Sequence, residues 1–519
     1  MANNIKTKIT RFGYIVNKNL IDDETIKEIK SDLTVVPFKI NNYAPKYIKN
    51  EGFPLYVENG NYIGIPKYYG FDKLGEPDID KVSNYEYPVQ DMTYTGTLRP
   101  HQQMVSDKII KGMEEGGGGV LVMGCGSGKT NVAIYIACKF KLRTLFVVHK
   151  TFLRDQVIDR IKSNTNVKKV GIIQRKIVNY KHPFVVSMVQ SLAKINYNDE
   201  IFKDFGMIII DEVHHMGARN FSTVYQKISS KYMLGISAEY TRTDGMYKII
   251  NWYMGPILHL EEQKPNEMVI VKQFYYSTSN KERIKMKYIN GDTNKPNRSK
   301  MITNLFYIKR RNRFILYLIQ ELFDMGKNIL FLSGRLKQID LLYELLNNDE
   351  FTHGNVGKYI GGMKESSLKK SAMKQIILGS YDMASEGLDI EGLNVVILGT
   401  PKTSIKQSVG RILRKEVYEE HPIVIDIVDV DNDTFKKQSK SRNNYFQKQK
   451  YNIQKYYISE SLKQKYELWN DKEYIKKVLV EIPEIPDKQT QDMIKTNPNP
   501  KKKYQGPINI DELNFLEDD

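Results

Sequence analysis

The chain has 519 residues, of which 41% are hydrophobic and 27% charged, and its net charge is +17. This length can bury two or three hydrophobic cores, and the longest apolar runs are too short to cross a membrane. Two cysteines supply neither a disulfide framework nor a zinc site, and the polar N-terminus lacks the features of a signal peptide. We therefore expect a soluble intracellular protein whose positive charge suits nucleic acid, with a merely lysine-rich composition as the alternative.

Residues 1–90 alternate apolar and polar positions around turn residues, which predicts a small α+β module with one helix over residues 22–33. Lys67, Tyr68, Tyr69 and Phe71 cluster near its end. They could form a stacking and phosphate-contact surface, but aromatic side chains in a small module more often form its core, which we favour. Residues 72–95 are polar and are predicted to be a linker.

Short β-branched runs then alternate with helical stretches in two successive regions, 97–262 and 263–435. Such continuous apolar strands are typical of parallel sheets covered on both faces, so we expect two tandem α/β domains with doubly wound parallel sheets. The segment around residues 263–300 joins them. The predicted strands are residues 120–123, 144–149, 183–188, 207–211 and 233–238 in the first domain, and 328–334, 356–361, 375–380, 395–400 and 422–428 in the second.

The last part of the chain changes character. Residues 436–482 are rich in lysine with interleaved tyrosines, which predicts a basic aromatic helical extension. This extension could lie along a nucleic-acid backbone or pack by its aromatic side chains onto the second domain. Residues 483–519 are predicted to be a flexible tail, with prolines and three successive lysines over 483–509 and an acidic end that is either a short docking peptide or without function.

One stretch has the pattern of a phosphate-binding loop. A short apolar strand leads into alternating glycines, then Lys129 and Thr130, then a helix. Glycines allow backbone N–H groups to surround a polyphosphate; the lysine reaches the β- and γ-phosphates, and the threonine hydroxyl binds Mg²⁺. Met123 replaces the first glycine of the strict pattern, so a glycine-rich turn with an incidental lysine is the alternative. The predicted nucleotide-binding residues here are Met123, Gly124, Cys125, Gly126, Ser127, Gly128, Lys129 and Thr130.

A second feature supplies the carboxylates that such a loop requires. Asp211 and Glu212 follow the apolar strand 207–211. Asp211 can hold the Mg²⁺ together with Thr130, and Glu212 can polarise the attacking water. His214 and a neighbouring histidine are too few for a metal site, so we expect His214 to hydrogen-bond between the nucleotide site and the neighbouring domain.

Phosphoryl transfer also requires positive charge on the γ-phosphate in the transition state. Arg411 and Arg414 lie three residues apart in a predicted helix beginning near Gln407, so they share one face. If this face meets the loop of the first domain, ATP lies in an interdomain cleft that hydrolysis opens and closes, as in a motor.

Taken in order, these segments resemble the motifs of superfamily 2 helicases of the DExH type. The matching segments are LRPHQ, MGCGSGKT, VVHKTFLRDQ, VSMVQSL, DEVH, ISAEYTRTDG, ILFLSGR, MASEGLDIEGLN and QSVGRILR. This superfamily often lacks the first glycine of the loop, which accounts for Met123. The resemblance implies two RecA-like domains over about residues 97–430, and its details look similar to helicases of large DNA viruses, including the poxvirus transcript-release helicase, and to phage branch-migration helicases.

By this resemblance, Gln102 reads adenine, while Gly387 and Asp389 lie where nucleotide and nucleic-acid strand meet. Ser237 and Ala238, with His214, couple the two domains. The expected catalytic residues are Lys129, Asp211, Glu212, Gln407, Arg411 and Arg414.

The third motif departs from the family because Glu239 and Tyr240 stand where Thr-Pro is usual. This departure puts strong coupling of ATP turnover to unwinding in doubt.

The leading hypothesis is an ATP- and Mg²⁺-dependent helicase or translocase that moves on or remodels DNA in viral transcription, replication or recombination. An RNA helicase is the first alternative, because no residue in the sequence indicates whether the bound strand carries a 2′-hydroxyl group. A nucleic-acid-binding factor with weak ATPase activity is the second. The expected partners are DNA or RNA and the transcription or replication machinery, and we expect a monomer without membrane contact.

Overall fold

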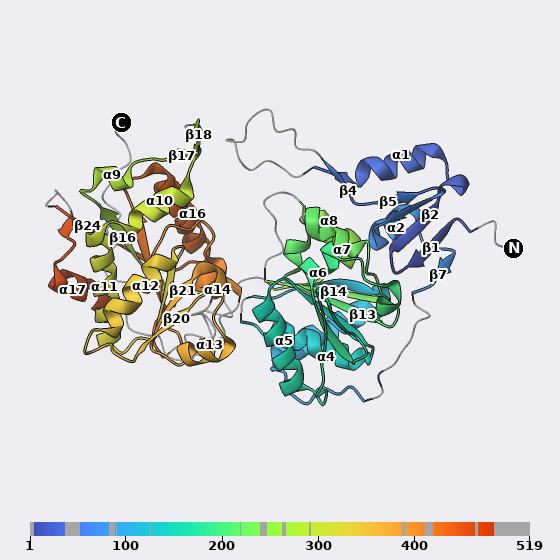
Figure 1. Cartoon of the computed structure of the whole chain (residues 1–519), viewed down its shortest axis with the longest axis horizontal. Helices are drawn as coiled ribbons and strands as arrows, with labels where there is room; N and C mark the ends of the chain where they lie inside the picture. The colour runs from blue at the N-terminus through green and yellow to red at the C-terminus, as the bar shows by residue number, and fades with distance from the viewer. Residues whose placement is uncertain are drawn as a thin grey trace, which may run out of the picture. The chain divides into compact units, whose positions relative to one another are not determined.

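The computed structural model describes residues 5–36, 52–82, 89, 91–124, 126–217, 219–238, 246–261, 266–289, 292–386, 390, 392–410, 419–461 and 466–481. The chain divides into two compact units, Met1–Glu261 and Glu262–Asp519, and each is described by itself (Figure 1). The described helices include none with the length and apolar character that a membrane crossing requires.

The first unit begins with a five-stranded sheet in the order β5-β6-β2-β1-β7. Strand alternation buries one face: Ile9, Tyr14, Val16 and Ile63 are fully buried in the core. The elements of this module are β1 (Thr7–Thr10), β2 (Gly13–Asn17), η1 (Lys18–Leu20), α1 (Asp23–Asp32), β3 (Thr34–Val35), β4 (Phe53–Pro54), β5 (Val57–Asn59), β6 (Tyr62–Ile65), α2 (Lys67–Leu74) and β7 (Ile79–Asp80).

The burial of side chains decides two of the predictions made for this region. Lys67 and Tyr69 are buried, and the Lys67 ammonium donates to the carbonyls of Ser230 (3.4 Å) and Lys231 (3.1 Å), so the core interpretation of this cluster is confirmed. The linker prediction for residues 72–95 is wrong in part. β7 pairs in parallel with β1, and Met92 is fully buried, because both segments complete apolar surfaces of the first unit.

The first unit continues with an eight-stranded sheet in the order β11-β10-β12-β9-β13-β14-β8-β15, parallel except for the β10–β11 pair. All five strands predicted for this region are confirmed; β10, β11 and β15 were not predicted. The elements are α3 (Pro100–Gly116), β8 (Gly118–Val122), α4 (Lys129–Phe140), β9 (Thr144–Val148), α5 (Thr151–Asn164), β10 (Gly171–Gln174), β11 (Ile177–Asn179), β12 (Phe184–Met188), α6 (Val189–Lys194), η2 (Asp199–Phe202), β13 (Met207–Asp211), η3 (Val213–Gly217), α7 (Arg219–Tyr225), β14 (Tyr232–Ser237), α8 (Tyr247–Met254) and β15 (Ile257–Leu260).

The second unit contains an eight-stranded parallel sheet in the order β20-β21-β19-β22-β23-β16-β24-β25. The five predicted strands are confirmed as β19 to β23, so the α/β class with two parallel-dominated sheets is confirmed as well. The elements are β16 (Ile270–Ser277), α9 (Lys281–Ile284), β17 (Tyr288–Ile289), β18 (Asp292–Pro296), α10 (Arg298–Phe306), α11 (Lys309–Asp324), β19 (Ile329–Ser333), α12 (Leu336–Asn347), β20 (Val356–Tyr359), α13 (Glu365–Ala372), β21 (Ile376–Ser380), α14 (Tyr381–Glu386), β22 (Val395–Leu398), α15 (Lys406–Val409) and β23 (Ile423–Asp429), then α16 (Asp433–Lys448), β24 (Asn452–Ser459), β25 (Glu467–Leu468) and α17 (Lys472–Val480).

The predicted helical extension over residues 436–482 is wrong in its middle part. Between α16 and α17, β24 pairs along its whole length with β16. Its tyrosines cover β16: Tyr456 stacks on Phe274 with ring centroids 5.4 Å apart, and Tyr457 stacks on Tyr275 at 5.1 Å. Cross-strand aromatic pairs stabilise a strand whose polar composition alone resembles a helix surface. The tail beyond residue 481 lies outside the described residues.

Candidate nucleotide site

The predicted phosphate-binding loop connects β8 to α4. Gly126 and Gly128 adopt positive φ angles of 78° and 83°, a conformation that favours glycine. A Cβ atom at Gly128 would also lie 2.3 Å from Nε2 of Gln102. The loop therefore depends on both glycines, and its last residue precedes the N-terminus of α4, where backbone N–H groups can bind an anion.

Met123 occupies the position where the strict pattern has glycine. Its side chain is fully buried in the core of the first unit, and its backbone N–H donates to the Ser237 carbonyl at 3.1 Å. Cys125 lies outside the described residues. Since Met123 does not require a positive φ angle here, a large apolar residue serves as well as glycine at the strand end.

Gln102 lies against this loop from the start of α3. Its Nε2 donates to the Ser127 carbonyl at 2.8 Å, and its Oε1 accepts from the Arg99 backbone N–H at 3.0 Å. The amide thus fixes the loop to α3. Its predicted role in reading adenine stays a prediction.

Glu261, at the end of β15, is a contact that the sequence analysis missed. Its carboxylate accepts from the Gly124 backbone N–H at 2.6 Å and lies 2.8 Å from Nε2 of His101. Glu261 follows an ordinary apolar strand and belongs to no motif, so no pattern in the sequence could have identified it.

The two predicted carboxylates lie at the end of β13, beside the loop. Asp211 Oδ1 accepts from the Glu212 backbone N–H at 2.9 Å, and Glu212 Oε1 lies 3.3 Å from the Lys129 ammonium. Glu212 has a φ angle of +47°, which is uncommon for a residue other than glycine and is often found at functional sites. Packing therefore holds Glu212 in a strained conformation that directs it toward Lys129.

The electrostatics of these carboxylates differ. Burial, followed by the neighbouring Glu212 charge, raises the pKa of Asp211 to about 6, whereas Lys129 acts in the opposite direction. Burial would also raise the pKa of Glu212, but Lys129 and then His214 outweigh it and hold this pKa well below its usual range. Glu212 is therefore the carboxylate that stays ionised.

His214 joins this cluster to β14. Its Nδ1 lies 2.9 Å from the Ser237 hydroxyl and 3.3 Å from Glu212 Oε2. These partners all belong to the first unit, and Ala238, which follows Ser237, is buried. Glu239 and Tyr240 lie outside the described residues. The predicted coupling role of His214, Ser237 and Ala238 stays a prediction.

The predicted residues of the second unit are described only in part. Gln407 is half-buried in α15. Gly387, Asp389, Arg411 and Arg414 lie outside the described residues, so their predicted roles stay predictions.

The residues at this site fit a magnesium ion. Two adjacent buried carboxylates face one ammonium group, and the raised pKa of Asp211 indicates that more positive charge would be accommodated. The buried Thr130 hydroxyl and the Asp211 carboxylate are the hard oxygen ligands that Mg²⁺ prefers. In the described residues no three His, Cys, Asp or Glu side chains gather as metal ligands.

Fold and site together define a P-loop nucleotide-binding protein with two α/β units. Residues 95–242 match the family described as "Type III restriction enzyme, res subunit". The chain is 23% identical over 453 residues to "Putative helicase 161L" of Invertebrate iridescent virus 6, covering 83% of this chain and 97% of that protein. It is 25% identical over 361 residues to "Putative ATP-dependent RNA helicase QP509L" of African swine fever virus, covering 63% of this chain and 69% of that protein.

A further relative is "DNA 3'-5' translocase XPB2" of Sulfurisphaera tokodaii, 29% identical over 170 residues, which are 32% of this chain and 38% of that protein. Among solved structures, that of T4 UvsW aligns with 88% of this chain and 99% of its own, at 17% identity and a TM-score of 0.33. The chain is thus similar, over most of its length, to a viral protein that is named a putative helicase.

Proposed function

We propose that this protein is a DExH-type helicase, a motor that hydrolyses ATP while it moves on or remodels DNA. The observation that carries the proposal is the cluster beside the β8–α4 loop, where Lys129 lies 3.3 Å from Glu212 and Glu212 directly follows Asp211. A phosphate-binding loop, an ammonium group and two buried carboxylates are the parts that phosphoryl transfer to water requires.

In this mechanism the loop and Lys129 bind the phosphates. The backbone N–H groups at the start of α4 point toward an anion, and the Lys129 ammonium neutralises charge on the β- and γ-phosphates. Lys129 then exchanges part of its interaction with Glu212 for one with phosphate. Gln102 and Glu261 hold the loop in shape through Ser127 and Gly124.

Glu212 is proposed to orient the attacking water. Its lowered pKa keeps it ionised, so one carboxylate oxygen can accept a hydrogen bond from the water as the bond to the γ-phosphorus forms. His214 holds the carboxylate from the other side. Thr130 and Asp211 would hold Mg²⁺, which neutralises phosphate charge when bound.

The second unit is proposed to complete the site. Arg411 and Arg414 would supply guanidinium groups to the γ-phosphate, with Gln407 in the same motif and with Gly387 and Asp389 near the bound strand. Nucleotide-dependent closure of the two units would then alter the grip on the strand, with His214, Ser237 and Ala238 transmitting the change.

DNA is the proposed substrate because the archaeal relative is named a DNA translocase. RNA is the second candidate, and the name of the African swine fever virus relative favours it. A net charge of +17 suits either polyanion.

The test is ATPase activity measured with a panel of single-stranded, duplex and branched DNA and RNA. We expect DNA to stimulate hydrolysis, and Lys129→Ala to lower the stimulated rate by roughly 100- to 1,000-fold, as removal of a transition-state charge does. Lys139→Ala is the matched control, because Lys139 is exposed on the same helix, α4.

Stimulation by RNA alone would overturn the DNA assignment and favour the second candidate. Full activity in Lys129→Ala would overturn the motor itself.

A further inference from the structure

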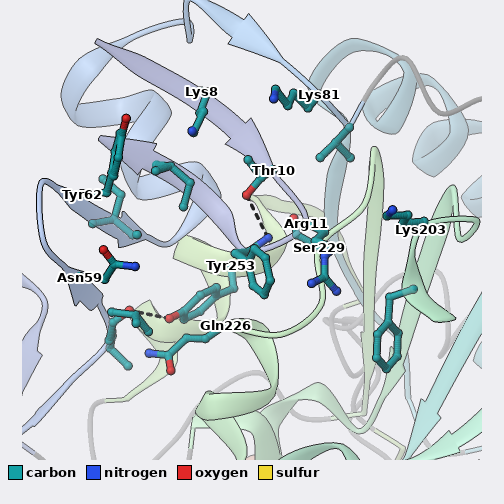
Figure 2. Close-up of a pocket in the computed structure, with 18 of the residues that line it drawn as sticks. Lys8, Thr10, Arg11, Asn59, Tyr62, Lys81, Lys203, Gln226, Ser229 and Tyr253 are labelled. Carbon is teal, nitrogen blue, oxygen red and sulfur yellow. Dashed lines mark hydrogen bonds between the residues drawn. The ribbon is translucent and has the colours of Figure 1, made fainter. Parts of the chain in front are cut away.

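A cavity of about 510 Å³ lies in the first unit, between the N-terminal sheet and the first α/β domain (Figure 2). This volume lies within the range of about 300–1,000 Å³ that is typical of ligand sites. The cavity is lined by other residues than the nucleotide site described above. No role has yet been given to it.

One wall of the cavity is the outer face of the N-terminal sheet. Lys8, Ile15, Gly64 and Val57 are successive cross-strand neighbours, so their side chains share this face. Tyr62 lies two residues before Gly64 and therefore on the same side. The opposite face carries the buried core, including Ile9, Tyr14, Val16 and Ile63.

The other wall comes from the first α/β domain and is fixed to the module. Phe202, Phe205, Ser229 and Tyr253 line it. The Tyr253 hydroxyl donates to the Leu55 carbonyl of the module at 2.7 Å, one of the two hydrogen bonds drawn in Figure 2. Since buried contacts hold both walls together, the cavity is formed before any ligand binds.

The charges that the described residues bring to the cavity are all positive. Among these residues the lining contains Lys8, Arg11, Lys81 and Lys203 but neither aspartate nor glutamate. Arg11 pairs with Asp199, and Lys203 pairs with Glu200. In the described part of the chain, no carboxylate lies within salt-bridge distance of Lys8 or Lys81. These two lysines are available for an anionic ligand.

Aromatic rings at the cavity offer stacking surfaces beside this charge. Phe12 and Tyr62 are 44% and 43% exposed, which is unusual for large aromatic side chains. The Lys8 ammonium lies 4.8 Å from the centre of the Tyr62 ring. An exposed ring beside lysines is the combination that binds a base and its phosphate in single-stranded nucleic acids.

A polar group inside the cavity also lacks a partner. Ser229 is only 8% exposed, and its hydroxyl makes no hydrogen bond with the described residues. Buried hydroxyls are normally paired, so Ser229 is an exception at the wall of the cavity. Gln226 lines the same wall and adds an amide that could read the edge of a base.

We propose that this cavity binds an unpaired nucleotide of a nucleic-acid strand. Tyr62 stacks on the base, Lys8 and Lys81 contact the flanking phosphates, and the Gln226 amide bonds to the edge of the base. The site rests on the proposed function in that the strand is the one on which the motor acts. An acidic peptide is the competing occupant, but it would make no use of the exposed rings.

The test compares two fluorescent oligonucleotides of equal length, oligo(dT) and an abasic backbone, binding to the full chain without ATP. Tyr62→Ala is expected to weaken oligo(dT) binding roughly 5- to 150-fold, the range typical of one stacked base, and to change binding of the abasic backbone less than about 2-fold. Tyr62→Trp should restore oligo(dT) binding, because it replaces the ring. Tyr62 is exposed, so its truncation leaves the core intact.

Lys81→Ala should weaken both oligonucleotides by a similar factor of roughly 3- to 10-fold and reduce the slope of log affinity against log salt by about 0.7. Lys27→Ala is the matched control, because Lys27 is exposed on α1 and does not line the cavity. Equal effects of Lys81→Ala and Lys27→Ala, or equal loss of both oligonucleotides in Tyr62→Ala, would overturn the proposal. Displacement of oligo(dT) by polyglutamate at equal charge concentration would favour the acidic peptide and overturn it as well.

Failure here is distinguishable from failure of the motor. If these variants bind like the wild type while Lys129→Ala abolishes ATPase activity, the cavity assignment falls and the motor stands. If they lose binding in a protein without stimulated ATPase activity, the motor falls and the cavity assignment stands.

Discussion

The two units use buried charge differently at the ends of two central strands, β13 and β23. In the first unit, β13 ends in Asp211 and is followed by Glu212, and Lys129 is the shared cation 3.3 Å from Glu212. In the second unit, β23 ends in Asp429, which is held by Arg311 through two hydrogen bonds of 2.6 and 2.9 Å. At the first strand end two adjacent carboxylates face one ammonium group and form an unsaturated cluster, whereas at the second a single carboxylate has its own guanidinium and forms a saturated pair.

The buried charges of the second unit have a structural role, whereas those of the first unit can take part in binding and chemistry. Arg311 is fully buried and also donates to the Gly399 carbonyl at 3.0 Å, and Arg442 forms a second buried pair with Asp426 at 2.9 Å. In a saturated pair each charge already has its partner, so the pair does not bind a ligand. It stabilises the fold mainly because neither buried charge is left unpaired. The unsaturated cluster of the first unit can instead accept a phosphate or a cation.

The largest expected effect comes from breaking the saturated pair. Arg311→Ala leaves Asp429 buried without its partner, which typically costs about 3–5 kcal/mol in the free energy of unfolding. Urea unfolding of the full chain, with hydrogen exchange to locate the loss, measures this. Arg313→Ala, exposed on the same helix, should cost less than about 0.5 kcal/mol. Similar losses in both variants would mean that the pair does not stabilise the second unit.

Glu212→Gln tests the unsaturated cluster. We expect the stimulated ATPase rate to fall roughly 100- to 1,000-fold, because the amide cannot accept the water's proton, while ATP binding persists. The thermal unfolding temperature should also fall modestly, because the lowered pKa of Glu212 means that Lys129 and His214 stabilise its charged form in the folded chain. A lower unfolding temperature with unchanged turnover would make Glu212 a structural residue like Asp429.

Lys272 of the second unit can be compared with Lys129 of the first, because it is a buried lysine without a catalytic neighbour. Its ammonium donates to the Val478 and Glu481 carbonyls at 2.5 and 2.8 Å, and burial lowers its pKa to about 8. The unfolded chain binds this proton up to about pH 10.5, so stability should rise with pH between about 8 and 10.5, by up to about 3 kcal/mol.

The measurement is the difference in unfolding free energy between wild type and Lys272→Met across this pH window, since other titrating groups cancel. Lys455→Met is the control, because Lys455 is exposed on β24. Its unfolding free energy should have the same pH dependence as that of the wild type. If the unfolding free energy of Lys272→Met has the same pH dependence as that of the wild type, the pKa of Lys272 is not lowered.

The smallest expected effect concerns Glu261. Glu261→Gln removes the charge from the hydrogen bond to Gly124 and from the contact with His101, which should lower kcat/KM for ATP roughly 3- to 10-fold. Glu114→Gln, exposed on α3, provides the comparison. If both variants behave alike, Glu261 does not help to shape the phosphate loop.

Patterns within a few residues predicted much of the fold. Ten apolar runs were each long enough, and sufficiently β-branched, to specify their strands. β16 and β24 were not predicted because polar residues interrupt their apolar ones, and the tyrosines of β24 gain their stability only from contacts with Phe274 and Tyr275 on β16. At the nucleotide site, the loop and the carboxylate pair were predictable, since each is a local motif. Glu261 was not, because only the path of β15 beside β8 brings it to Gly124.

The sequence by itself determined the class of protein, because glycines, a lysine and strand-end carboxylates at fixed spacing have few other uses. It also determined which strands are buried. The tertiary structure alone decided that Met123 turns into the core and that Lys67 is a buried tether rather than a nucleic-acid contact. It also decided that Lys8 and Tyr62 share a cavity wall. The reason is physical: a side chain's role depends on neighbours that are distant along the chain, and those neighbours exist only once the sheets have packed.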